Sequence, residues 1–301
     1  MAGRTMTYVT PPRLASLPQE RAQLEYSSRS LVFAEDGRRL LRAWGTPDRP
    51  FVIAVEPSGS RWKVEAWGAT PPVARAAARA LFSLDHPIEA FYHLVRTEPV
   101  LRGTERRFRG LRLPRDPSVY ESLLYAVIGQ QLSVRAARSL QLRLFERTGS
   151  AIEADGIAVP SAPSPRALRT LGPDGLRSIG LSRAKARTLL ALADWWPAAP
   201  DGRELAERPL EESVALLDAL PGVGRWTAEN ALLRGVGRID CFVAGDLGIR
   251  VGLAEYGVLP RHAPEERARA WADRWYPGWG SYATLYLWRK LVADRSAAAT
   301  G

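Results

Sequence analysis

The sequence is poor in the residues that build metal clusters and disulfide frameworks. Its 301 residues include one cysteine, Cys241, and three histidines, which are spread along the chain. A single cysteine excludes a disulfide within the chain and any four-cysteine zinc or iron–sulfur site. We therefore expect no iron–sulfur cluster and no cofactor, and we expect Cys241 to pack as a small buried apolar residue.

Long apolar runs are also missing. No stretch approaches the 18 or so apolar residues that span a membrane. The first 20 residues contain no apolar segment of the kind found in signal peptides. These absences lead us to expect a cytoplasmic protein without a membrane partner.

Lysine is scarce, although the chain is strongly basic. It carries 42 Lys and Arg against 32 Asp and Glu, a net charge of +10, and only Lys63, Lys185 and Lys290 are lysines. A basic excess suits a polyanionic partner, because each phosphate that the protein neutralises releases counterions. Basic chains without such a partner also exist, so the charge supports nucleic-acid binding without establishing it.

The amino-terminal quarter shows the pattern of a small β-sheet. We expect residues 1–22 to be a poorly ordered lead-in, followed by short strands at 31–34, 40–44, 51–55 and 62–67. Asp36 and Gly37 form a hairpin-turn signal between the first two. A helix over 72–81, rich in alanine and arginine, completes this unit, in which we find no motif that carries chemistry.

The rest of the chain shows helical periodicity. The predicted helices are 88–95, 118–127, 136–147, 165–171, 181–196, 210–220, 264–275 and 281–293, with a loop over 149–165. The predicted fold class is α+β: an antiparallel sheet domain with a helix over residues 1–80, then a mostly α-helical domain over 81–301. A composition with 46% apolar residues can bury a substantial core in a chain of this length.

The most informative stretch is a glycine-rich join between two of these helices. Leu220-Pro221-Gly222-Val223-Gly224 separates the helix over 210–220 from a second helix that starts near Arg225. Glycines let the backbone approach a ligand closely, and a helix N-terminus favours a phosphate. An ordinary helix–helix corner, with the glycines serving only packing, explains the spacing equally well.

The residues after this join carry a family resemblance. The run Leu-Pro-Gly-Val-Gly-Arg-Trp-Thr-Ala from Leu220, with Asp246 inside Val-Ala-Gly-Asp-Leu, resembles the helix-hairpin-helix DNA glycosylase superfamily. Within it, the chain looks most like the 3-methyladenine DNA glycosylase II (alkylation-repair) family. Segments 128–134, 180–185 and 277–283 are also similar, and the resemblance covers residues 81–292. It implies a two-lobed helical core, with lobes of about 113–230 and of 81–112 plus 231–301.

The resemblance makes Asp246 the catalytic residue. Release of a base breaks an N-glycosidic bond through a sugar with cationic character, and a fixed carboxylate stabilises that cation or orients the attacking water. The same aspartate, followed by Leu-Gly-Ile-Arg, is also a plausible helix N-cap. The two roles are compatible.

The resemblance also points to a pocket for the damaged base. Trp226 and Trp279 match its aromatic positions, where an indole face attracts a purine made cationic by methylation. Asn230 and Leu247 stand where relatives often carry further aromatic residues, so the range of substrates is open. The alternative is that both tryptophans belong to the core, as most of the ten must. We assign Trp44, Trp195, Trp196 and Trp288 to packing.

The expected reaction is hydrolysis without strand cleavage. Relatives that also nick DNA carry a lysine at the position of Trp226, where it forms a Schiff base. Here the pair is Arg225-Trp226, and an arginine side chain stays protonated and is no amine nucleophile. We therefore expect a monofunctional enzyme that leaves an abasic site.

Two segments are expected to contact DNA. The resemblance places Gly222, Gly224, Arg225 and Thr227 against the DNA backbone. It places Gln130, Gln131 and Leu132 in the gap left by the flipped nucleotide, with Gln131 as the foremost wedge. Filling this gap offsets part of the few kcal/mol that extrusion costs. A helix–helix turn whose glutamines face solvent is the alternative.

The resemblance further implies a structural sodium or potassium ion. Its ligands would be the main-chain carbonyls of Asp218, Leu220 and Val223, and it would help to neutralise a DNA phosphate. No side chain in the sequence indicates this site.

We thus expect a monomeric, nucleoid-associated DNA glycosylase that acts on double-stranded DNA and removes 3-methyladenine- and 7-methylguanine-type bases. One alternative is a glycosylase for uracil, hypoxanthine or an oxidised purine, which Asn230 and Leu247 keep open. The other is a helix-hairpin-helix module that binds DNA without catalysis.

Overall fold

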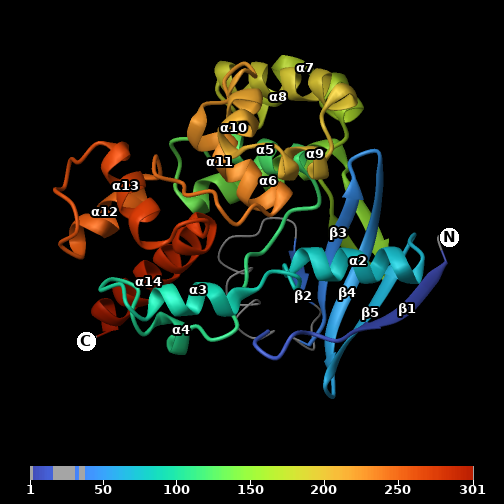
Figure 1. Ribbon diagram of the computed structural model, residues 1–301. Helices are drawn as coiled ribbons and strands as arrows, with labels where there is room; N and C mark the ends of the chain where they lie inside the picture. The colour runs from blue at the N-terminus through green and yellow to red at the C-terminus, as the bar shows by residue number, and fades with distance from the viewer. Residues whose placement is uncertain (1–2, 16–30, 34–37, 301) are drawn as a thin grey trace.

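The computed structural model describes residues 3–15, 31–33 and 38–300 of the chain. A five-stranded antiparallel sheet occupies one side of the molecule, and helices make up the rest (Figure 1). The strand order is β1-β5-β4-β3-β2. The strands are β1 (Arg4–Val9), β2 (Leu31–Phe33), β3 (Leu40–Thr46), β4 (Arg49–Ser58) and β5 (Arg61–Trp67).

The central strand β4 is buried on both faces. Ile53 and Val55 belong to a cluster with helix α2 (Pro71–Leu81), which lies across the sheet in Figure 1. Val52 and Ala54 point to the opposite face, because neighbouring residues of a strand alternate between faces. This double burial explains the continuous apolar run in the middle of β4.

The opposite face is covered by a hairpin within a segment that was predicted to be a loop. Residues 149–165, predicted as a loop, contain β6 (Ala151–Ala154) and β7 (Ile157–Pro160), which pair with each other and pack on Val52 and Ala54. The turn is Asp155-Gly156, with φ of +50° and +77°. Both values suit a tight hairpin turn, so the prediction of a loop was wrong although the Asp-Gly signal was present.

The amino terminus also differs from expectation. Residues 4–9, predicted as part of a poorly ordered lead-in, form the edge strand β1 and pair with β5 from Arg4↔Trp67 to Val9↔Trp62. The partner lies more than 50 residues away, which explains why local patterning was a weak guide. The predicted Asp36-Gly37 turn lies outside the described residues, whereas β2 and β3 on either side do pair antiparallel.

A buried ion pair joins the sheet to the helical part. Arg42 on β3 is 1% exposed, and its Nη2 donates to Asp116 Oδ1 at 3.0 Å and to Glu121 Oε1 at 2.9 Å. Removing one partner of such a pair leaves a buried charge uncompensated. The sheet and the helices therefore depend on each other.

The helical part begins with the two short helices α3 (Ile88–Val95) and α4 (Thr104–Arg107). It continues with α5 (Val119–Gly129), α6 (Val134–Thr148), α7 (Pro165–Ser178), α8 (Arg183–Trp195), α9 (Gly202–Glu207), α10 (Leu210–Asp218), α11 (Arg225–Ala231), α12 (Leu247–Glu255), α13 (Glu265–Trp275) and α14 (Gly280–Thr300). A 3₁₀ turn, η1 (Trp196–Ala198), follows α8, and a π-helical turn, η2 (Leu232–Val236), follows α11. The existence of each predicted helix is confirmed.

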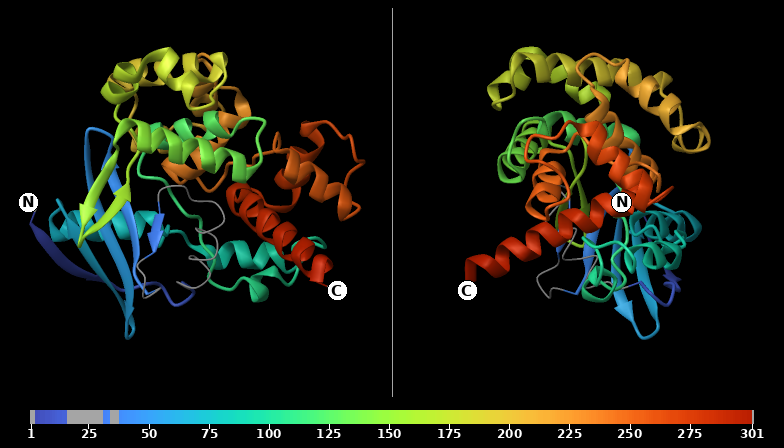
Figure 2. Two further views of the ribbon diagram at one scale, coloured as in Figure 1. Left: turned by 180° about the vertical axis from the view of Figure 1, so that it is seen from behind. Right: turned by 60° about the vertical axis from the view of Figure 1, so that its left-hand side comes forward.

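These helices form two groups (Figures 1 and 2). Helices α5 to α11 lie together at the top of Figure 1, and α3 and α4 lie beside the carboxy-terminal helices α12 to α14. Phe91 of α3 stacks edge-on against Tyr286 of α14 with ring centroids 5.0 Å apart. Helix α5, buried almost throughout, belongs to one apolar core that reaches both groups.

His86, just before α3, is held in its neutral form. Its Nδ1 lies 3.0 Å from the Tyr282 hydroxyl, and burial, helped by the Arg115 and Arg112 charges, lowers its pKa to about 4 from 6.5. The unfolded chain therefore binds a proton at higher pH than the folded chain does. This contribution to stability is complete above pH 6.5 and is lost as the pH falls towards 4.

We expect the free energy of unfolding to fall by roughly 1.3 kcal/mol between pH 7.5 and 5.5 because of His86 alone. Urea unfolding of the wild type and of His86→Asn at both pH values measures this term, since asparagine keeps a polar partner for Tyr282 and does not titrate. Equal pH dependence of the two proteins would contradict the assignment.

Candidate active site

The glycine-rich join is a turn between α10 and α11, as predicted. Gly222 has φ +76°, and a Cβ built on it would lie 2.0 Å from Thr188 Oγ1 of α8. Gly224 precedes α11 with φ −99°, and a Cβ there would meet nothing within 4 Å. The two glycines therefore serve different ends: Gly222 is required by the fold, whereas Gly224 leaves the first turn of α11 open to a ligand.

The side chain of Arg225 is engaged within the protein. Its Nη2 lies 2.6 Å from Glu211 Oε1 and its Nε 2.9 Å from Glu229 Oε1, and the bond to Glu211 raises its pKa. Glu229 is 1% exposed and also pairs with Arg269 at 2.9 Å. With its side chain paired in this way, Arg225 offers the predicted DNA contact only its backbone N–H, which lies in the first turn of α11.

The segment predicted to enter DNA is a short loop between α5 and α6. Gln131 and Leu132 are exposed there, and Gln131 has φ +55°. Gln130 is not free: its Nε2 donates to Gly222 O and to Thr227 Oγ1, both at 3.0 Å. Of the three residues predicted to enter DNA, Gln131 and Leu132 are exposed, whereas Gln130 connects the loop to the hairpin.

Asp246 is the N-cap of α12, and its carboxylate accepts three N–H donors. Ile249 N donates to Oδ1 at 3.0 Å, Trp226 Nε1 to Oδ2 at 3.3 Å, and Trp288 Nε1 to Oδ1 at 3.3 Å. The side chain is partly exposed. The carboxylate therefore caps α12 and lies between two indole N–H groups with access to solvent, an arrangement compatible with the predicted catalytic role.

Trp288, which was assigned to packing, does pack against the main core, and its indole N–H also donates to Asp246. It lies on α14, 42 residues beyond Asp246, so no local pattern in the sequence could connect them. The Arg234 guanidinium lies over its ring at 5.5 Å, a cation–π contact, and burial lowers the pKa of Arg234. The Asp246 carboxylate thus has an aromatic neighbour that the sequence reading did not supply.

The other pocket candidates are less closely grouped. Asn230 is 8% exposed, and its Nδ2 donates to Trp226 O at 2.9 Å, so the amide turns back on its own helix. Leu247 is 67% exposed beside Asp246. Trp279 packs on Phe91 and Tyr282, with centroids 6.0 and 5.5 Å apart, and its place in a base pocket stays a prediction.

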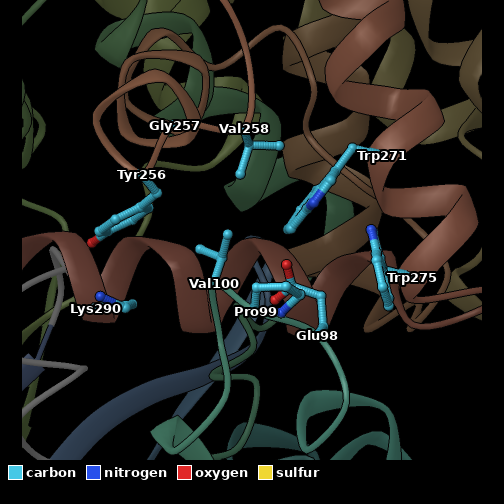
Figure 3. Close-up of a pocket in the computed structure, with 9 residues that line it drawn as sticks. All are labelled: Glu98, Pro99, Val100, Tyr256, Gly257, Val258, Trp271, Trp275 and Lys290. Carbon is cyan, nitrogen blue, oxygen red and sulfur yellow. The ribbon is translucent and has the colours of Figure 1, made fainter.

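A separate pocket of about 430 Å³ lies where α13 and α14 meet the chain before α4 (Figure 3). Trp271 and Trp275 line one end, and Lys290 stands over the Tyr256 ring at the other, 4.0 Å from its centroid. None of the residues predicted to contact DNA or the lesion lines it.

Metal-binding clusters are absent from the part of the chain that the structure describes: no group of three or more His, Cys, Asp or Glu residues is placed to hold an ion. Cys241 is buried, with its Sγ 3.4 Å from Glu229 O, and burial raises the pKa of the thiol. Within the same residues, no helix has the length and apolarity to cross a membrane.

Comparison with known proteins agrees with this geometry. Residues 124–277 match the model of the HhH-GPD superfamily of base excision DNA repair proteins. The DNA-3-methyladenine glycosylase of Bacillus subtilis is 28% identical over 70% of this chain and 69% of its own length. A probable bifunctional transcriptional activator/DNA repair enzyme AlkA of Mycobacterium tuberculosis is 34% identical over 72% of this chain, but only 42% of that relative is matched.

Among solved structures, the 3-methyladenine DNA-glycosylase from Archaeoglobus fulgidus superposes with a TM-score of 0.79 at 25% identity. The superposition covers 96% of this chain and 98% of that one, so it includes the amino-terminal sheet. The predicted fold class is confirmed. The chain belongs to the HhH-GPD superfamily of base excision DNA repair proteins.

Proposed function

We propose that the chain is a monofunctional DNA glycosylase that flips alkylated purines of the 3-methyladenine and 7-methylguanine type out of duplex DNA and hydrolyses their glycosidic bond. The observation that carries this proposal is the Asp246 carboxylate, held by Ile249 N–H and two indole N–H groups. The names of the B. subtilis and A. fulgidus relatives support the choice of lesion.

The reaction follows from charge placement. The bond between C1′ of the sugar and the purine nitrogen breaks, and its electron pair neutralises the positive charge of the methylated base. The Asp246 carboxylate stabilises the cationic sugar, water adds its oxygen to C1′, and the released proton goes to the carboxylate or to solvent. The products are a free base and an abasic site.

The indoles around Asp246 suit a cationic base. Trp226 and Trp288 reach the carboxylate with their Nε1 edges, and an indole face attracts a cation by about 0.5–2 kcal/mol. Methylation at N3 or N7 also weakens the glycosidic bond. A stacking pocket with few hydrogen bonds to the base therefore suffices, which fits the inward turn of the Asn230 amide.

The lysines support hydrolysis without strand cleavage. Lys63 pairs with Glu56 at 3.0 Å, Lys185 donates to two main-chain carbonyls, and Lys290 pairs with Asp294 at 2.5 Å. Every lysine amine of the chain is thus committed to another partner, and none contacts Asp246. Within the part of the chain that the structure describes, no lysine amine is placed at Asp246 to begin Schiff-base chemistry.

We also propose that the protein acts as a monomer on double-stranded DNA, in the cytoplasm at the nucleoid. The net charge of +10 supports a DNA partner. A monovalent cation at the hairpin belongs to the same proposal. The turn offers the carbonyls of Asp218, Leu220 and Val223 within six residues, and the Leu220 carbonyl also accepts Val223 N at 3.0 Å.

The test is base release from duplex DNA that carries N-methylated purines, with chromatographic identification of the freed base. We expect free 3-methyladenine and 7-methylguanine, and strand breaks only after alkali treatment. Duplexes with uracil, hypoxanthine or an oxidised purine serve as parallel substrates. Release from one of those alone would replace the lesion assignment, and tight binding without any release would indicate a binding module.

A further inference from the structure

A lysine lies under the loop that is proposed to enter DNA. Lys185 is on the first turn of α8, and its Nζ donates to Ile128 O at 2.8 Å and to Gln130 O at 2.7 Å. Both carbonyls lie at the carboxy-terminal end of α5, where a positive charge interacts favourably with the helix dipole. Burial lowers the pKa of Lys185. One side chain thus closes the end of α5 immediately before the loop.

The loop that follows has an unfavourable backbone conformation. Gln131 has φ +55°, a region that residues other than glycine, asparagine and aspartate rarely adopt. Such a conformation persists only where the surroundings impose it. Ser133 caps α6 on the far side of the loop through Ala136 N at 3.2 Å. On the near side, the two bonds from Lys185 fix the carbonyls just before Gln131.

The same loop is connected to the DNA-binding hairpin. Gln130 donates to Gly222 O and Thr227 Oγ1, so its carbonyl is held by Lys185 while its amide holds the hairpin turn. Gln130 therefore joins three segments that lie far apart in sequence: the carboxy-terminal end of α5, the first turn of α8, and the turn between α10 and α11. The exposed Gln131 and Leu132 project from this junction.

We propose that Lys185 is a positioning residue for base flipping: its two hydrogen bonds preset the 129–133 loop so that Gln131 and Leu132 enter the DNA stack while the hairpin holds the backbone. This inference rests on the proposed function, because a wedge has a role only if a nucleotide is extruded. Lys185 does not touch the lesion or Asp246 and takes no part in bond cleavage.

The variant Lys185→Met tests the proposal, since methionine has a similar length and no donor. Arg187→Met on the same helix is the matched control: it removes the same charge from an exposed position. The readout is the fluorescence of 2-aminopurine next to an abasic-site analogue in duplex DNA, which reports unstacking and requires no base release. Melting temperatures show whether each variant is folded.

We expect wild type and Arg187→Met to raise the fluorescence on binding, and Lys185→Met to bind with affinity within about threefold of the control while losing most of the signal. Base release from a paired lesion should fall about tenfold or more in Lys185→Met, and release of the same lesion from a single-nucleotide bulge should change much less. A role limited to folding would lower both rates equally.

The outcomes separate this inference from the proposed function. A full fluorescence response in Lys185→Met, no response in the wild type, or equal loss on paired and bulged lesions would overturn the positioning role. If the wild type raises the fluorescence but releases no alkylated base, the proposed function is wrong. The role of Lys185 in positioning the loop is then decided by the fluorescence of the variants alone. If Lys185→Met does not fold, Lys185→Leu, which likewise has no donor, takes its place.

Discussion

Asp246→Asn is expected to lose base release by a factor of about 10² to 10³ or more, equivalent to roughly 2.7–4 kcal/mol of transition-state stabilisation. Asparagine keeps the shape but removes the negative charge opposite the cationic sugar. It also replaces one acceptor oxygen with a donor, whereas all three hydrogen bonds of the Asp246 carboxylate come from N–H donors. One indole N–H therefore loses its partner.

Single-turnover base release measures this loss, and fluorescence anisotropy with an abasic-site duplex measures binding, which should stay within a few-fold of wild type. Asp273→Asn is the matched control, since Asp273 is exposed on α13 and makes no recorded contact with the site. Normal release by Asp246→Asn would refute the mechanism. Parallel loss of binding and release would indicate that the carboxylate mainly supports the start of α12.

The two hairpin glycines should fail in different ways. Gly222→Ala forces a Cβ to within 2.0 Å of Thr188 Oγ1 at a backbone φ of +76°. We expect it to cost roughly 2–4 kcal/mol of folding free energy, from backbone strain together with the clash. Urea unfolding measures this cost, and adding Thr188→Ala should recover only the part that comes from the clash.

Gly224→Ala has room for its methyl group and an ordinary φ of −99°, so we expect a loss of at most about 1 kcal/mol. Its methyl group would stand at the start of α11, where we propose that the DNA backbone binds, and the affinity for DNA should fall about tenfold with a weaker salt dependence. The reverse pattern, with Gly224→Ala unstable and Gly222→Ala binding poorly but stable, would contradict the separate roles given to the two glycines.

The sequence was a good guide at most places where the signal is local, with the missed Asp155-Gly156 hairpin as an exception. The hairpin between α10 and α11, the capping position of Asp246 and the exposure of Gln131 follow from residues within a few positions of one another. Glycine, proline and N-cap residues impose local geometry, and that geometry survives folding.

The sequence was a poor guide where partners lie far apart along the chain. The sequence indicated only a packing role for Trp288, whereas in the fold α14 brings its indole N–H to Asp246. It placed Lys185 only in a turn, whereas in the fold the side chain bonds to the end of α5. The strand β1 is recognisable only from its pairing with β5. In each case a tertiary contact, which no periodicity encodes, determines the role.

The sheet contains no part of the proposed chemistry, yet the helices depend on it. Strands β6 and β7, which lie between two helices in the chain, pack on Val52 and Ala54 of the sheet. Arg42 of the sheet in turn forms ion pairs with Asp116 and Glu121 of the helical part. The two parts should therefore unfold as one cooperative unit. Damaging substitutions in the sheet would then reduce the amount of folded enzyme in the cell and leave the turnover of each surviving molecule unchanged.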